Sequence, residues 1–170
     1  MKTTIAMTVV SAVLLTASVA TAQSAGASCD RACLLSTADA YLAALVAHDA
    51  SKASMAPNAR FTEQTKVMRV GDEGLWKSAI STSTTFKIPV PDPVSGQIGM
   101  IVMMKASGSA FPAPPARGNV PAPDPNAPAD IQLALRLRVV DRKITEAEHI
   151  IARIAALSRW ATSVRERVFR

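Results

Sequence analysis

Glu63 is the first residue whose type and position could do acid–base chemistry. It follows Ala59 and Phe61 at alternate positions of a short predicted strand, residues 58–65, so these side chains share one face. If this face lines an apolar interior, the Glu63 carboxylate loses hydration and its pKa rises toward the range of a general base. The alternative is a structural role, in which Glu63 caps or salt-bridges the next turn.

His48 and Asp49 form a second candidate, a histidine beside a carboxylate that could orient it. Neighbouring residues at a helix end point in different directions, however, and Asp49 is well placed to cap a second, shorter helix over residues 50–55. We therefore expect Asp49 to act as a cap, and we keep His48 as a catalytic candidate.

The last predicted hairpin carries two more carboxylates, and the length of its turn decides where they point. With a two-residue turn at positions 141–142, Glu146 and Glu148 lie on the apolar face of the preceding strand, where one is forced to stay protonated. With one more residue in the turn, they oppose Arg138 and Arg136 instead.

We favour the longer turn, because Arg142 fits poorly in the left-handed geometry of a two-residue turn and unpaired carboxylates are costly to bury. In that register Ala147, His149 and Ile151 face inward. His149 then becomes a candidate site residue, although a hydrogen-bonded core histidine is the commoner role.

A pocket for a flat hydrophobic ligand could be lined by Phe61, Trp76 and methionines, Met103 among them. At strand spacing the methionines are also ordinary core candidates. The sequence has no Gly-rich phosphate loop, metal-ligand cluster or Gly-x-Ser-x-Gly elbow. We therefore expect neither a cofactor nor a metal.

The elements that position these side chains follow from apolar spacing. Residues 31–48 repeat apolar side chains every three or four positions, which predicts a helix. Gly71 and Gly74 bracket a turn into a helical segment around Trp76. Four further segments are predicted strands: 82–90, 98–106, 131–140 and 144–154. Helices followed by antiparallel strands predict one α+β domain, with the helices on one face of a curved sheet.

Two segments stand apart from this pattern. Residues 108–130 hold seven of the eleven prolines, which excludes a helix or a central strand. We expect an extended loop between two strands, or alternatively a flap or partner-binding arm. After residue 154 a helical pattern is formed by Leu157, Trp160, Val164 and Val168, with arginines at 159, 165, 167 and 170.

The N-terminus predicts a signal peptide over residues 1–22. Lys2 precedes an uncharged apolar stretch, and Ala20-Thr21-Ala22 has the small-x-small pattern of a cleavage site before Gln23. The stretch is shorter than the roughly 20 residues that span a bilayer. We expect an exported protein, periplasmic or secreted, with one domain over residues 23–170 and no membrane partner after cleavage.

Cysteines and charge agree with export. The only cysteines, Cys29 and Cys33, predict a local disulfide. Without Lys2 the chain keeps 18 basic and 13 acidic side chains, a net charge of +5. There is no nucleic-acid-binding motif, so we expect a basic, solvated surface and no nucleic-acid partner.

Several stretches together resemble one known superfamily. They are Ala47-His48-Asp49, the strand from Ala59 to Glu63, the turn from Gly71 to Trp76, and the hairpin over residues 135–146. The chain resembles the nuclear transport factor 2-like superfamily, which includes SnoaL-like and ketosteroid-isomerase-like proteins. It is similar to a group of exported members that begin with Cys-x3-Cys-Leu, here residues 29–34. The resemblance implies a cone-shaped, curved antiparallel sheet with N-terminal helices on its concave face.

The resemblance also implies a function. Such cones accept a small, mostly apolar molecule and run cofactor-independent proton transfer. In ketosteroid-isomerase-like members a tyrosine of the first helix donates a hydrogen bond to an oxyanion, and a carboxylate further along the chain abstracts the proton. Tyr41 and Glu63 are spaced similarly.

We therefore expect a lyase, dehydratase or isomerase acting on a small hydrophobic or aromatic molecule, with Glu63, Tyr41 and a histidine in its site. The alternative is a non-catalytic ligand-binding or dimerisation module on the same fold. A homodimer is a further expectation, because members of the superfamily often dimerise through the sheet.

Overall fold

The computed structural model describes residues 29–107, 124 and 127–154. The predicted signal peptide, most of the proline-rich insert and the predicted last helix lie outside these residues. The helical elements are α1 (Arg31–Val46), the 3-10 turn η1 (Ala50–Lys52) and α2 (Leu75–Ser78). The strands are β1 (Met55–Glu63), β2 (Lys66–Met68), β3 (Ala79–Asp92), β4 (Gln97–Ala106), β5 (Ala129–Val140) and β6 (Lys143–Arg153).

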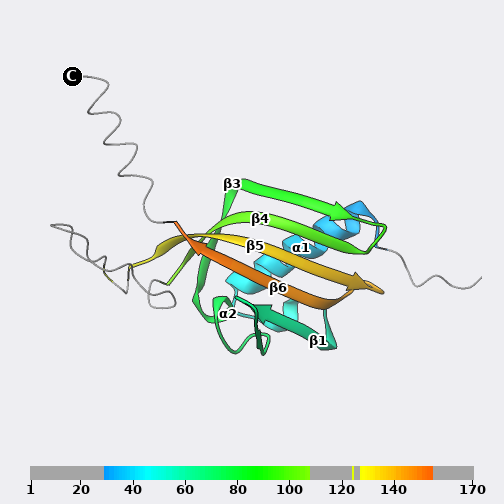
Figure 1. Ribbon diagram of the computed structural model, residues 1–170, viewed down its shortest axis with the longest axis horizontal. Helices are drawn as coiled ribbons and strands as arrows, with labels where there is room; N and C mark the ends of the chain where they lie inside the picture. The colour runs from blue at the N-terminus through cyan, green and yellow to red at the C-terminus, as the bar shows by residue number, and fades with distance from the viewer. Residues whose placement is uncertain (1–28, 108–123, 125–126, 155–170) are drawn as a thin grey trace, which may run out of the picture.

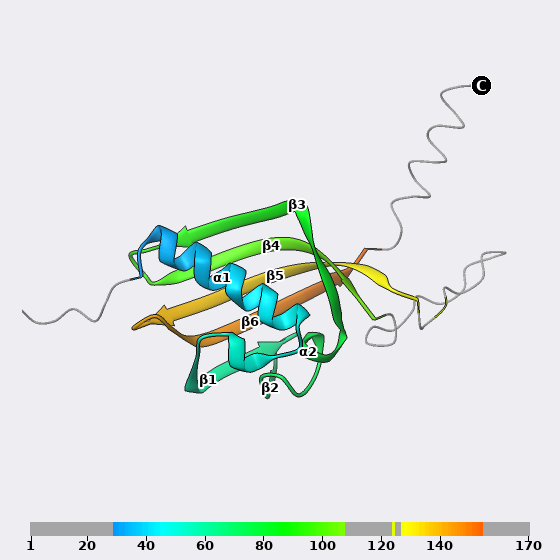
Figure 2. The ribbon, with the colours of Figure 1, turned by 180° about the vertical axis from the view of Figure 1, so that it is seen from behind.

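The strands form one curved sheet in the order β2-β1-β6-β5-β4-β3, and α1 lies across one of its faces (Figures 1 and 2). We call this the inner face and the opposite one the outer face. The predicted α+β class is confirmed. The sheet is mixed, because β1 pairs in parallel with β6 while the other neighbours are antiparallel. No short turn joins β1 to β6, so nothing local requires the two strands to run in opposite directions.

Helix α1 begins with an N-cap residue and a disulfide bond. Asp30 is its N-cap and accepts a hydrogen bond from the backbone N–H of Cys33 at 2.8 Å. The predicted disulfide is present between Cys29 and Cys33. The helix ends earlier than predicted, and His48 beyond it adopts a left-handed backbone with φ 54°.

Asp49 acts as the predicted cap. Its carboxylate accepts from the backbone N–H of Ser51 at 3.1 Å and opens η1. The predicted helix over residues 50–55 is reduced to three residues, because the extended strand β1 already starts at Met55.

The core lies between α1 and the inner face. Strands β4 and β5 show strict alternation of buried and exposed side chains, as the sequence predicts. Their buried residues are Ile98, Met100, Val102, Met104, Ala106, Ala129, Ile131, Leu133, Leu135, Leu137 and Val139. Together with the buried side of α1, all of them except Ala129 form one hydrophobic cluster.

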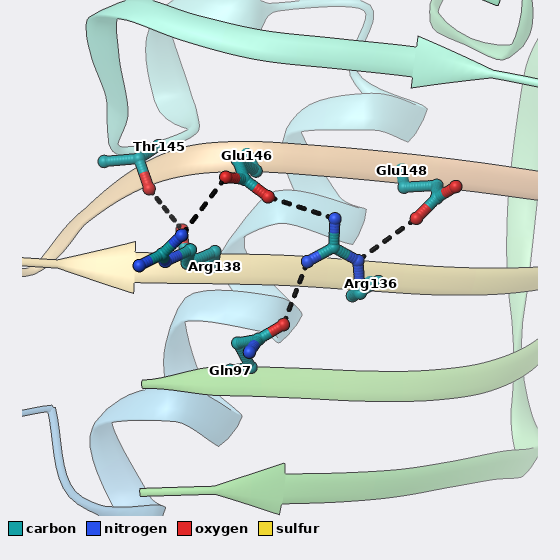
Figure 3. A network of polar contacts seen from close by, with 6 residues as sticks. All are labelled: Gln97, Arg136, Arg138, Thr145, Glu146 and Glu148. Carbon is teal, nitrogen blue, oxygen red and sulfur yellow. Dashed lines mark hydrogen bonds and ion pairs between the residues drawn. The ribbon is translucent and has the colours of Figure 1, made fainter. Parts of the chain in front are cut away.

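The last hairpin confirms the predicted pairing but not the predicted turn. Arg136 lies opposite Glu148 and Arg138 opposite Glu146 (Figure 3). His149 lies on the inner face and is fully buried. The prediction of a longer turn is wrong, because only positions 141 and 142 connect the strands, both in the left-handed region at φ 49° and 59°.

A bulge supplies the extra residue that the turn lacks. Val139 pairs with Ile144, whereas Arg138 pairs with Glu146, so Thr145 is left over in β6. The bulge shifts the side chains that follow it by one position. It therefore turns His149 inward and keeps both carboxylates on the outer face.

Candidate functional site

Three predicted site residues meet on the inner face. The Tyr41 hydroxyl lies 3.0 Å from Nε2 of His149, and Nδ1 of His149 lies 3.2 Å from Oε2 of Glu63. Glu63 and His149 are direct partners in the parallel β1–β6 ladder, which places both side chains on one face. Tyr41 approaches them from the buried side of α1. We call these three residues the buried triad.

Burial and partners fix the protonation of the buried triad. Burial lowers the pKa of His149. The hydrogen bond to Glu63 and the charge of Glu63 oppose this shift but are smaller than it. Burial raises the pKa of the Tyr41 phenol well above its usual range; the Trp76 indole opposes this shift and the Glu63 carboxylate adds to it. A neutral His149 then donates a hydrogen bond from Nδ1 to Glu63, and its Nε2 accepts a hydrogen bond from the Tyr41 hydroxyl.

Glu63 is also held by the start of α2. The backbone N–H of Leu75 donates to both carboxylate oxygens, at 3.2 and 3.0 Å. Gly74 makes room for this contact, because a Cβ built on it would overlap the carboxylate. The structural role predicted as the alternative for Glu63, a cap on the next turn, therefore matches its geometry.

Aromatic rings surround the buried triad. The Phe61 ring meets His149 edge to face at 4.9 Å between centroids, and the Trp76 ring meets Tyr41 at 5.3 Å. Two of the three predicted ligand-lining residues, Phe61 and Trp76, thus contact the site. The Trp76 indole Nε1 is buried and makes no hydrogen bond within the part of the chain that the structure describes.

Two predicted site residues do not join this group. His48 is exposed and donates from Nδ1 to the carbonyl oxygen of Trp76 at 2.7 Å, which ties the end of α1 to α2. Met103 lies on the outer face, where it lines a pocket of about 380 Å³ with Ser81, Thr82 and Lys105. Its side chain is therefore separated from the buried triad by the sheet.

A second pocket, of about 210 Å³, also lies on the outer face. Arg60, Thr62, Arg136, Glu146 and Glu148 line it, and Arg136 is already bonded to both carboxylates. Neither this pocket nor the one at Met103 touches the buried triad.

Two other kinds of feature are absent from the described residues, a metal site and a membrane-spanning helix. No group of three or more histidine, cysteine or acidic side chains there could hold a metal ion. No helix among the same residues is long and apolar enough to cross a membrane.

Sequence reasoning missed the carboxylate seat formed by Gly74 and Leu75. The available signal is the turn bracketed by Gly71 and Gly74, which by itself predicts only a helix start. A glycine with φ 62° directly before a helix marks a place where another group approaches the backbone closely.

The fold is nuclear transport factor 2-like, as the sequence resemblance implied. One similar solved structure is a hydroxylase candidate from Streptomyces galilaeus, with 16% identity, TM-score 0.52, and coverage of 78% of this chain and 87% of that chain. A polyketide cyclase candidate from Xanthomonas campestris pv. campestris has 13% identity, TM-score 0.50, and coverage of 76% and 95%.

A pinacolase from Penicillium brevicompactum is similar at 10% identity and TM-score 0.50, with coverage of 81% of this chain and 91% of that chain. No family model matches the sequence, and no curated protein does. At these identities the likeness establishes the fold, and the site must be argued from its own residues.

Proposed function

We propose that the protein is an enzyme that moves a proton on a small hydrophobic or aromatic molecule without a cofactor, as a lyase, dehydratase or isomerase. The observation that carries the proposal is the buried triad. A neutral imidazole backed by a carboxylate and facing a phenol is an arrangement that serves general acid–base catalysis.

The contacts assign a role to each member. His149 Nε2 is the base. Its lone pair carries no proton and accepts a hydrogen bond only from the Tyr41 hydroxyl, whereas the Glu63 oxygens accept from the Leu75 backbone. Glu63 is a positioning residue, since Leu75 and His149 already occupy its oxygens. Tyr41 is the hydroxyl donor. This assignment moves the base from Glu63, the sequence prediction, to His149.

The reaction follows from these roles. A proton on a carbon beside a carbonyl passes to His149 Nε2, and the electron pair of the C–H bond moves onto the carbonyl oxygen as an enolate. The Tyr41 O–H turns from His149 to that oxygen, while Glu63 stabilises the imidazolium. His149 then returns the proton to another carbon, as in an isomerase, or to a departing hydroxyl, as in a dehydratase.

Two further observations support parts of the proposal. The similar solved structures carry the names of enzymes, which agrees with catalysis and leaves the reaction open. The disulfide at Cys29 and Cys33 supports the proposed export, because such bonds persist in oxidising compartments.

A non-catalytic ligand-binding module is the second candidate. Tyr41 and His149 have no exposed surface, and Glu63 has 8%. Glu63 also has a complete structural task in holding α2. A triad that serves only to join α1, β1, β6 and α2 would show the same contacts.

Hydrogen–deuterium exchange into small molecules separates these two candidates. The purified protein is incubated in deuterium oxide with a panel of small hydrophobic and aromatic carbonyl compounds, and deuterium at the carbon beside the carbonyl is measured by mass spectrometry. We expect exchange with at least one compound, and a loss of about 100-fold or more in the rate for His149→Gln. His48→Gln is the matched control and keeps the rate.

The proposal fails if no compound exchanges above the buffer blank. It also fails if His149→Gln exchanges as fast as the parent protein.

A further inference from the structure

The Trp76 indole N–H is a buried hydrogen-bond donor that the resting site does not use. Its Nε1 atom makes no hydrogen bond to any residue that the structure describes. The whole side chain is buried, so bulk solvent does not contact it either. Leaving a buried donor unpaired is costly, and such groups are rare in native proteins. The indole N–H therefore marks a place where a hydrogen-bond acceptor is expected.

This N–H is directed toward the hydroxyl of Tyr41. The two rings meet edge to face, with 5.3 Å between their centroids and 80° between their planes. Burial raises the pKa of the Tyr41 phenol, and the Trp76 indole opposes this rise. A donor has this effect when it lies on the side of the phenol oxygen. The contact still falls short of a hydrogen bond, so the N–H keeps its capacity to donate.

Two donors therefore converge beside the proposed base. The Tyr41 O–H lies 3.0 Å from Nε2 of His149, and the Trp76 N–H approaches the same oxygen from α2. Helix α2 lies beside the end of α1 (Figure 2). An acceptor atom that takes the Tyr41 hydrogen bond away from His149 thus comes within the neighbourhood of the Trp76 N–H.

The position of Trp76 is fixed before any ligand binds. Trp76 is the second residue of α2, and the first residue, Leu75, donates its backbone N–H to both oxygens of Glu63. Gly74 gives the carboxylate the space for this contact. A donor that is already held in place stabilises a developing charge without reorganisation of the protein.

We propose that the Trp76 N–H and the Tyr41 O–H together bind one oxygen of a neutral carbonyl compound. This inference rests on the proposed function, in which the proton beside the carbonyl passes to His149 Nε2 and the C–H electron pair moves onto that oxygen. The two donors then share the negative charge of the enolate. Trp76 is a catalytic residue in this step, because its hydrogen bond strengthens as the charge develops.

The charge of Glu63 favours a substrate that is neutral when it binds. Beyond the effect of burial, this charge raises the pKa of Tyr41 further, which means that a negative charge at the Tyr41 oxygen is disfavoured. An enolate is tolerated there because it forms together with the imidazolium of His149. A carboxylate ligand brings its charge without that partner. Ketones, aldehydes and esters therefore fit the site better than carboxylates do.

Nuclear magnetic resonance of the indole N–H tests the contact without turnover. The chain has two tryptophans, and Trp160→Phe identifies which signal belongs to Trp76 in protein with isotope-labelled tryptophan. Acetophenone, a neutral aromatic ketone, should move the Trp76 signal downfield as the hydrogen bond forms. Its analogue α-methylstyrene has a methylene group in place of the oxygen and should cause no downfield shift. Benzoate, which has the same ring and a carboxylate, should leave the signal unchanged.

Trp76→Phe tests the role of the donor in the deuterium-exchange reaction. The change keeps an aromatic ring beside Tyr41 and removes the N–H. The maximal exchange rate should fall about 100-fold. KM should change much less, because the hydrogen bond is stronger to the enolate than to the bound ketone. Phe86→Leu, which removes a ring from a residue that is 42% exposed, should keep the rate.

The two measurements separate this inference from the proposed function. A Trp76 signal that acetophenone moves, in a protein that exchanges no compound, supports the oxygen site and refutes catalysis. Exchange that is as fast in Trp76→Phe as in the parent protein overturns the donor role and leaves His149 as the base. A Trp76 signal that acetophenone does not move in the parent protein overturns the inference. So does a shift that is lost in Tyr41→Phe at saturating ketone, since the indole would then act only through Tyr41.

Discussion

At the scale of single residues, Glu63 receives hydrogen bonds from two directions. The Leu75 backbone N–H and the His149 imidazole both donate to its carboxylate. A carboxylate held in this way is a good orienting group, and it is a weaker base than a free carboxylate because both of its oxygens already accept hydrogen bonds. The sequence identified Glu63 correctly as a buried acidic residue, but its strand face alone could not show which groups occupy its oxygens.

The lowered pKa of His149 predicts how stability depends on pH. Below pH 6.5, the ordinary histidine value, the unfolded chain binds a proton that the native chain does not bind, so the free energy of unfolding falls as pH falls. The slope reaches about 1.4 kcal/mol per pH unit. Urea denaturation between about pH 7 and pH 5 measures it, above the range in which ordinary carboxylates protonate.

His149→Gln should remove this slope, whereas His48→Gln should keep it. An identical pH dependence in parent protein and His149→Gln would mean that His149 is not buried as a neutral group.

Met103 and His48 show that local sequence patterns do not determine which way every side chain points. Alternation predicts that Met103 and Met104 point to opposite faces, but it does not say which of those faces α1 covers. The structure puts Met104 in the core and Met103 outside. His48 falls in a left-handed position after the helix, and no helical spacing rule predicts where such a side chain points.

At the scale of elements, the turn before α2 controls the site. Gly74 has φ 62° and ψ −136°, a combination reserved for glycine, and its missing side chain leaves the space that Glu63 occupies. Gly74→Ala should therefore lower the free energy of unfolding by about 1–3 kcal/mol and displace Glu63 from Leu75. Urea denaturation measures the loss.

Gly99→Ala is the matched control, because a Cβ there meets nothing within 4 Å. It should leave stability unchanged or slightly raised. Equal stabilities of the two variants would contradict the proposed carboxylate seat.

Strand β6 shows how an element-level prediction can be right for the wrong reason. The sequence argument that two carboxylates should not be buried predicts the pairing of Arg138 with Glu146, and this pairing is present. The pairing is reached in a different way from the one predicted. The extra residue is Thr145 in a bulge of β6, and the turn has no third residue. The free-energy cost of burying a charge favours the register that keeps both carboxylates exposed. It does not determine whether the extra residue lies in the turn or in a bulge of the strand.

At the scale of the whole molecule, most of the α+β architecture could be predicted. The helix over residues 31–48 and the four later strands are all present in the structure, with bounds shifted by a few residues. The parallel contact between β1 and β6 could not be predicted from local spacing, because it joins segments at opposite ends of the domain. That contact is what brings Glu63 to His149.

The two faces of the sheet carry different kinds of side chains. The inner face buries the core and the triad, and the outer face carries the ion pairs of Arg136 beside exposed isoleucines.

Nuclear magnetic resonance of the imidazole nitrogens of His149 tests the buried triad most directly. We expect a neutral ring at pH 7 with its proton on Nδ1, and a change in that proton's resonance in Glu63→Gln but not in His48→Gln. A charged ring, or a neutral ring protonated on Nε2, would contradict the chain of hydrogen bonds on which the proposed chemistry rests.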